Sequence, residues 1–206
     1  MKSVFDHSKA WRLESADDQP YEEDILRRRT YCHASNDARL HARAYRGAAI
    51  RRCLADFEDA IASQAFEMVV YIGHNGLMDF ELPPPPKAEP RGRRPDVVVL
   101  CCKSQSYFSI RVELAGGRPV LTTTQFMYPG SFILEAAADG WLRGAPPPDF
   151  ARAGRQRLRR QSEYFPPCGP RRLCRPSSDT AHPISEKILG THPRKILGTH
   201  PNKYLS

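Results

Sequence analysis

VVYIGHNGLMDF, residues 69–80, begins as an apolar run and then breaks at a Gly-His-Asn-Gly turn. A second segment, DVVVLCCKS at residues 96–104, repeats the pattern and carries two cysteines where its apolar run ends. Short apolar runs bounded by turn residues are typical of strands that are buried on both faces of a parallel sheet. The two segments therefore predict successive strands that bring a histidine and a cysteine to their carboxyl ends.

Helix and strand patterns alternate around these two segments. Apolar residues recur at three- and four-residue spacing within residues 48–64, which predicts an amphipathic helix lying on the sheet. These residues are Ile50, Cys53, Leu54, Phe57 and Ile61. Further helices are expected at 104–117 and 129–144, and a third buried strand at 119–124. The alternation predicts an α/β fold, a three-layer sandwich with a mostly parallel sheet.

The chain divides by composition into three parts. Residues 1–37 are polar and charged without clean periodicity, and we expect a mobile N-terminal arm or a short helix there. Residues 38–144 form the predicted α/β domain. Within it, residues 39–44 predict a short strand, and the proline-rich stretch 82–95 predicts an exposed loop. Residues 145–206 are rich in Pro and Arg, and we expect a disordered tail.

The tail ends in a tandem octapeptide, KILGTHPR followed by KILGTHPN. Two such copies are too few and too short for a solenoid. No strand is expected past Gly144. One hypothesis is that the tail is a frameshifted or read-through translation that was never selected for folding.

Charge is unevenly distributed and limits the classes of function. The formal net charge is +8, and residues 145–206 carry 12 of the 31 basic and 4 of the 23 acidic side chains. The rest is neutral, with 19 of each, so we expect no specific nucleic-acid binding, although the tail could bind polyanions nonspecifically. No apolar stretch predicts a membrane span or a signal peptide, and no cysteine pair has CxxC spacing. A cytoplasmic protein with free thiols is therefore expected.

The ends of the two central strands predict a shared site. Neighbouring strands lie roughly 4.8 Å apart, so residues just beyond them, His74 and Cys102, could come within side-chain reach. A thiol beside an imidazole is the minimal nucleophile–base pair for attack on a carbonyl. Gly73 and Gly76 suit the tight turn that carries the histidine. Main-chain amides at Cys102 and near Gly76 could serve as an oxyanion hole.

In these residues the chain resembles the caspase-like cysteine peptidase clan. The clan's hallmark is an apolar strand running into a His-Gly turn, followed by an apolar strand running into a small residue and Cys, and VVYIGHNG and VVVLCCKS match it in order. The resemblance covers roughly residues 39–144 and implies a caspase-like (flavodoxin-like) α/β core and a protein or peptide substrate. It makes Cys102 the nucleophile, His74 the base, and Cys101 the small residue. Asn75 separates the histidine from its glycine.

Other side chains are candidates for the pocket, and other chemistries stay open. Four residues at or just after predicted strand ends could line a pocket: Cys101, Ser104, Thr124 and Asp79. Asp79 could also recognise a basic substrate group. A metal held by His74, Cys101 and Cys102 with His33 or Cys32 is a less favoured alternative, and no metal or cofactor is expected. The main alternative is a non-enzymatic α/β interaction module. Oligomeric state is left open.

Sequence motifs of several other enzyme classes are absent. There is no Arg six residues after either cysteine, as a tyrosine phosphatase would need, and no GxGxxG or GxxxxGK[ST] phosphate-binding loop. The segment YPGSF is not a GxSxG elbow, so a serine hydrolase is unsupported.

Overall fold

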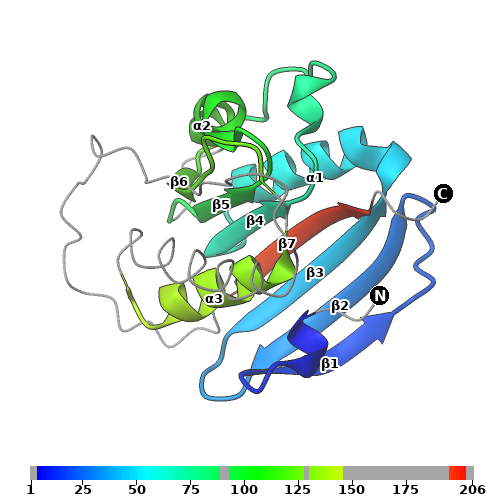
Figure 1. Ribbon diagram of the computed structural model, residues 1–206, viewed down its shortest axis with the longest axis vertical. Helices are drawn as coiled ribbons and strands as arrows, with labels where there is room; N and C mark the ends of the chain where they lie inside the picture. The colour runs from blue at the N-terminus through cyan, green and yellow to red at the C-terminus, as the bar shows by residue number, and fades with distance from the viewer. Residues whose placement is uncertain (1–3, 89–92, 128–129, 146–194, 203–206) are drawn as a thin grey trace, which may run out of the picture.

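The computed structural model describes residues 4–88, 93–127, 130–145 and 195–202, and one seven-stranded sheet organises them in the order β1-β2-β3-β7-β4-β5-β6 (Figure 1). The strands are β1 (Trp11–Asp17), β2 (Ile25–His33), β3 (Arg39–Arg46), β4 (Met68–Ile72), β5 (Asp96–Leu100), β6 (Arg118–Leu121) and β7 (Lys195–Asn202). The helices are α1 (Ile50–Ala62), α2 (Ser104–Leu114) and α3 (Ser131–Leu142), with short 3-10 turns η1 (Val4–His7), η2 (Gly47–Ala49) and η3 (Gly76–Met78).

The predicted α/β fold with a mostly parallel sheet is confirmed. The sheet is parallel from β3 through β7, β4 and β5 to β6. At its other edge, β2 pairs antiparallel with both β1 and β3. Every residue of β4 and β5 is buried, as their unbroken apolar runs predict. The three expected helices begin and end within a few residues of their predicted limits.

Helices cover both faces of the sheet. Alternate residues of a strand point to opposite faces, so Tyr71 of β4 packs on the α1–α2 side and Val70 on the α3 side. The first core contains Phe57 of α1 and Phe108 of α2, and the second contains Ile133 of α3. Figure 1 shows α1 and α2 on one side of the sheet and α3 on the other. Across the described ranges, no helix combines the length and the apolar character needed to cross a bilayer.

The N-terminal segment is not the polar arm that its composition suggests. Residues 11–17 and 25–33 form β1 and β2, which extend the sheet beyond β3. Charged side chains of β2 pair with carboxylates of the loop that follows β1, as in Arg29 with Asp18 at 2.5 Å. Trp11 and Tyr31 are buried on the face that α3 covers. Charge pairing on the solvent side and a few large aromatic residues on the core side hold these strands in place.

The tail also departs from expectation. The second octapeptide, residues 195–202, forms β7 and lies between β3 and β4. A strand therefore does follow Gly144, and this part of the tail belongs to the fold. The rest of the expected disordered tail, residues 146–194 and 203–206, lies outside the described residues.

Candidate functional site

His74 and Cys102 occupy corresponding positions beyond neighbouring strands. β4 and β5 pair in parallel up to Ile72 and Leu100, and the Gly73 amide continues the ladder by donating to the Leu100 carbonyl at 3.2 Å. Each candidate residue follows two positions after the last paired residue of its strand. The register thus brings the histidine and the cysteine to the same edge of the sheet.

The His74 ring is oriented by a carboxylate that the sequence analysis had assigned to substrate binding. Nε2 of His74 lies 2.5 Å from Oδ2 of Asp79, just after η3. The hydroxyl of Tyr71 donates to the His74 carbonyl at 2.5 Å and fixes the main chain of the turn. A proton on Nε2 shared with Asp79 leaves the lone pair of the ring on Nδ1. The imidazole is therefore held in the tautomer that a general base at Nδ1 requires.

Cys102 lies at a sharp turn between β5 and α2. The next residue, Lys103, adopts a left-handed conformation with φ of 51°, and α2 begins at Ser104. The half-buried sulfur accepts from the Met127 amide at 3.5 Å and donates to the Met127 carbonyl at 3.6 Å. Among the described residues these main-chain atoms, and not the His74 ring, are the hydrogen-bond partners of the thiol.

Asn75 joins the two strand ends. Its side chain is fully buried, and Nδ2 donates to the Cys102 carbonyl at 2.7 Å while Oδ1 accepts from the Leu77 amide at 3.1 Å. The residue that interrupts the His-Gly sequence thus fixes the histidine turn against the cysteine turn. Sequence reasoning placed Asn75 in the turn but did not foresee this contact, because the Cys102 carbonyl comes into reach through the strand register alone.

The glycine amides of the turn are already engaged. Gly73 donates to the sheet, and the Gly76 amide donates to the His74 carbonyl at 3.1 Å. A Cβ on Gly76 would come within 2.8 Å of the Phe80 ring and 2.9 Å of Ile50, so a side chain at this position would have to displace both. Of the two amides expected to form an oxyanion hole, the one at Gly76 is therefore occupied within the turn.

Cys101 and Ser104 are parts of the interior rather than of a pocket. Both are fully buried, and burial raises the pKa of the Cys101 thiol well above its usual range. The Ser104 hydroxyl donates to the Val99 carbonyl at 2.8 Å and accepts from the Thr123 amide at 2.8 Å. The Thr123 hydroxyl in turn donates to the Cys101 carbonyl. This buried network, which the sequence analysis missed at Thr123, holds the turn that presents Cys102.

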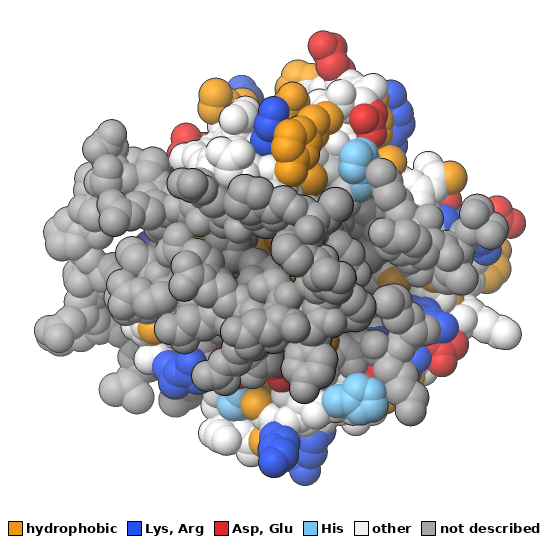
Figure 2. Space-filling view, viewed as in Figure 1, with side chains coloured by type: hydrophobic (Ala, Val, Ile, Leu, Met, Phe, Trp, Pro, Cys, Tyr) orange, Lys and Arg blue, Asp and Glu red, His pale blue; other side chains and the backbone are white. Residues whose placement is uncertain are grey.

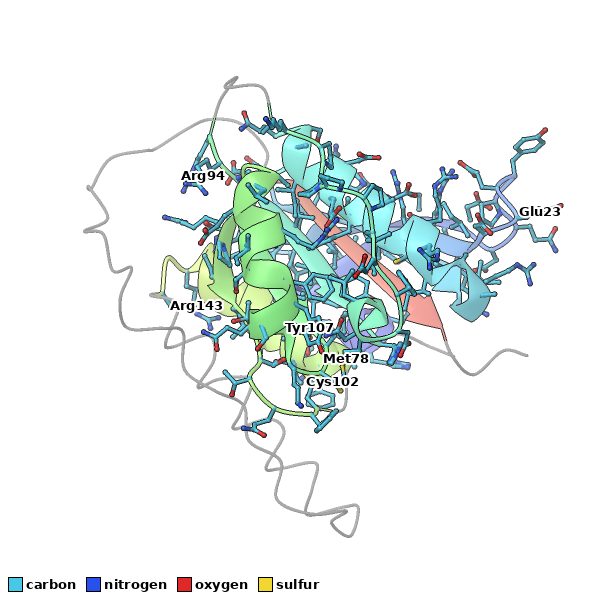
Figure 3. All side chains as sticks on the ribbon, turned by 90° about the horizontal axis from the view of Figure 1, so that it is seen from above. Glu23, Met78, Arg94, Cys102, Tyr107 and Arg143 are labelled. Carbon is cyan, nitrogen blue, oxygen red and sulfur yellow. The ribbon has the colours of Figure 1, made fainter. Side chains whose placement is uncertain are left out.

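Exposed apolar side chains surround the same end of the sheet. Met78 of η3, Tyr107 in the first turn of α2 and Phe126 beside Met127 are 38%, 37% and 58% exposed. Figure 3 shows Met78, Tyr107 and Cys102 at one end of the molecule, and Figure 2 shows apolar and charged side chains gathered there. The Lys103 ammonium lies 4.7 Å from the Phe126 ring centre. Thr124, the remaining pocket candidate, is half-buried nearby.

The sheet topology argues against the metal alternative. β3 and β7 separate β2 from β4, and β2 runs antiparallel to β3, so Cys32 and His33 lie at the end of the sheet opposite His74. His33 instead packs edge-on against Trp11, with 4.9 Å between the ring centres. Within the described residues, no three His, Cys, Asp or Glu side chains form a group that could hold a metal ion.

Comparisons of the chain with protein-family models, with curated proteins and with solved structures give no match. The function must therefore be argued from the geometry of the site.

Proposed function

We propose that the protein is a cysteine-type hydrolase of peptide bonds with Cys102 as nucleophile, His74 as general base and Asp79 as the group that orients the base. The observation that carries this proposal is the register of β4 and β5, which delivers a thiol and a carboxylate-held imidazole to one edge of the sheet. The resemblance to the caspase-like clan supports the same pair. By that resemblance, Cys102 and His74 take the positions of the cysteine and the histidine of the motif.

The proposed reaction uses the sulfur of Cys102 and Nδ1 of the His74 ring. On substrate binding the Cys102 side chain rotates from the Met127 main chain toward His74, since catalytic hydrogen bonds are often formed only in the substrate complex. The thiol proton passes to Nδ1 of His74, and the sulfur forms a bond to the substrate carbonyl carbon. The imidazolium then protonates the leaving amine as the C–N bond breaks. Water, deprotonated by His74, hydrolyses the thioester and restores the thiol.

The surroundings of Cys102 favour a peptide with an apolar side chain next to the scissile bond. Met78, Tyr107 and Phe126 offer exposed apolar surface at the mouth of the site. Apolar contact on both sides of a reacting carbonyl excludes water and positions the carbon for attack. The main-chain amide of Cys102 is the donor proposed for the oxyanion.

The second candidate is an interaction module that keeps the fold without turnover. Two observations favour it: the resting thiol hydrogen-bonds with the Met127 main chain, and the Gly76 amide is engaged by the His74 carbonyl. In such a module the exposed apolar side chains would contact a partner protein. The two candidates differ in whether Cys102 forms a covalent bond with substrate.

The test combines peptide hydrolysis with thiol labelling. We expect a library of fluorogenic peptides to yield a cleaved sequence, with Cys102→Ala abolishing cleavage and His74→Ala lowering its rate at least ~100-fold. Iodoacetamide should label Cys102 more slowly in His74→Ala and in Asp79→Asn than in the unchanged protein. Cys32→Ala, which removes a thiol from β2, is the matched control and should leave both measurements unchanged. No cleavage by the unchanged protein, or a labelling rate of Cys102 that is the same in His74→Ala, would favour the interaction module. Cleavage that persists in Cys102→Ala would overturn Cys102 as the nucleophile.

A further inference from the structure

β7 fills a gap in the middle of the sheet. It pairs in parallel with β3 along all of Lys195–Asn202 and with β4 from Ile196 to Thr199. The chain runs from β3 through α1 to β4 and skips one strand position, which the distant octapeptide then occupies. Figure 1 shows β7 in red between these two strands. We call the position between β3 and β4 the strand slot.

The strand slot selects side chains on both faces of the inserted strand. Ile196 is fully buried on the α3 side, in the core that contains Leu40, and Leu197 is buried on the α1 side. Gly198 returns to the first face, where a Cβ would lie 3.8 Å from Leu40 and 3.9 Å from Leu134. An added Cβ at these distances makes only ordinary van der Waals contact, so the slot selects two successive apolar residues and does not require glycine after them.

The chain contains this sequence twice. Residues 187–194 are KILGTHPR and residues 195–202 are KILGTHPN, so the copies differ only at their last position. A shift by eight residues is even, and an even shift in a strand keeps every side chain on its own face. The first copy could thus present Ile188, Leu189 and Gly190 to the slot as the second presents its equivalents.

The length of chain that connects α3 to each octapeptide copy does not strongly favour either copy in the slot. Between Ala145 and the start of the octapeptide there are 41 residues for the copy at 187 and 49 for the copy at 195. Either length spans the molecule, and the entropy of closing a loop changes slowly with its length.

The last position does distinguish them. Arg46 of β3 is the register partner of Asn202, and the first copy would place Arg194 there instead. Two like charges at neighbouring positions of a ladder repel each other. This difference favours the copy found in the slot, and the other seven positions of the two copies are identical.

We propose that the strand slot is a peptide-accepting site for an extended segment with two adjacent apolar residues, Ile and Leu in both octapeptide copies, and that either copy occupies it, the copy at 195–202 predominating. The occupant is added in parallel between β3 and β4.

The test uses point variants of the full chain. An aspartate in the slot would bury a charge against an apolar core, so a copy that carries it is excluded. In Leu197→Asp the first copy should take over, with an unfolding midpoint within about 3 °C of the unchanged protein, whereas Leu189→Asp combined with Leu197→Asp should lower the midpoint by about 10 °C or more. Leu189→Asp alone is the matched control and should have no effect.

Hydrogen exchange identifies which copy is in the slot. Amides paired with β3 and β4 exchange slowly, so protection should lie on residues 195–202 in the unchanged protein and move to residues 187–194 in Leu197→Asp. A Leu197→Asp protein as unstable as the double variant, or one in which residues 187–194 stay unprotected, would overturn the exchange of copies.

A synthetic peptide tests the site separately. Added KILGTHPN should restore the unfolding midpoint of the double variant in a saturable manner, and KIDGTHPN should not. No rise in the midpoint at millimolar KILGTHPN would overturn the peptide-accepting site.

Discussion

At the scale of the residue, the candidate site depends on the strand register for its position and on the following loops for its contacts. The apolar runs at 69–72 and 96–100 place His74 and Cys102 beyond two successive strands, and the structure has both at one edge of the sheet. The contacts of Asp79 with the ring and of Met127 with the sulfur depend on how loops fold back. No periodicity encodes such loop geometry.

Cys101 gives the chain a definite response to alkaline pH. Burial raises its pKa, so the folded protein keeps the proton at a pH where the unfolded chain releases it. Since the unfolded state then binds fewer protons, stability is full below the ordinary thiol pKa near 9.0 and falls as the pH rises above it. We expect a slope of up to about 1.4 kcal/mol per pH unit from this group.

The measurement is urea unfolding between pH 8 and 10. Cys101→Ala should be less stable than the unchanged protein at pH 8 because it leaves a small cavity, and should lose less stability as the pH rises. Cys32→Ala removes a thiol from a partly exposed site and should keep the slope of the unchanged protein. Equal slopes in all three proteins would contradict the role of Cys101.

At the scale of the element, strongly patterned segments could be predicted and charge-rich strands could not. The spacing of apolar residues predicts α1, β4 and β5, because the packing of those residues in the core is enough to stabilise these elements. β2 carries three successive arginines, and its burial shows no simple alternation because Asp18 and Glu22 of the loop between β1 and β2 supply the partners of these charges. β7 contains Gly and Pro and lies after a Pro- and Arg-rich segment, so its strand character comes from the slot that it enters.

An ion pair fixes α2 against α1, and its loss should destabilise the fold. The Arg111 guanidinium donates to both carboxylate oxygens of Glu58, at 2.6 and 2.9 Å, and also to the Pro83 carbonyl. Glu58 is 5% exposed, so Glu58→Ala leaves a largely desolvated arginine and should lower the free energy of unfolding by about 2 kcal/mol or more. Arg52→Ala, which breaks the exposed pair with Asp56, should cost less than about 1 kcal/mol. If chemical denaturation gives the same loss of unfolding free energy in Glu58→Ala and Arg52→Ala, the ion pair between α1 and α2 does not contribute more than an exposed pair.

At the scale of the whole molecule, the sheet makes the antiparallel N-terminal strands and the parallel strands one body. The β1–β2–β3 ribbon and the β4–β5–β6 strands are joined through β7, and the core on the α3 side runs across them all. Sequence composition alone divided the chain into arm, domain and tail. At the C-terminal end the division failed because a central sheet position can be filled by a segment far away in the chain, which no local pattern reveals. At the N-terminal end it failed because the arginines of β2 pair with loop carboxylates and hide the strand in its composition.

Trp11 tests whether the N-terminal strands and α3 unfold as one unit. The indole is 2% exposed, contacts Phe5 edge-on at 5.8 Å between ring centres, and donates from Nε1 to Asp139 of α3 at 3.2 Å. Trp11→Ala should lower the free energy of unfolding by about 3–5 kcal/mol, because a large cavity opens between the ribbon and the helix. Leu13 lies on the same strand but is 46% exposed, so Leu13→Ala should cost less than about 1 kcal/mol. If the ribbon belongs to the common core, fluorescence and circular dichroism will report a single shifted transition in Trp11→Ala. A separate early transition, with the parallel strands keeping their original midpoint, would instead mean that residues 4–46 fold independently.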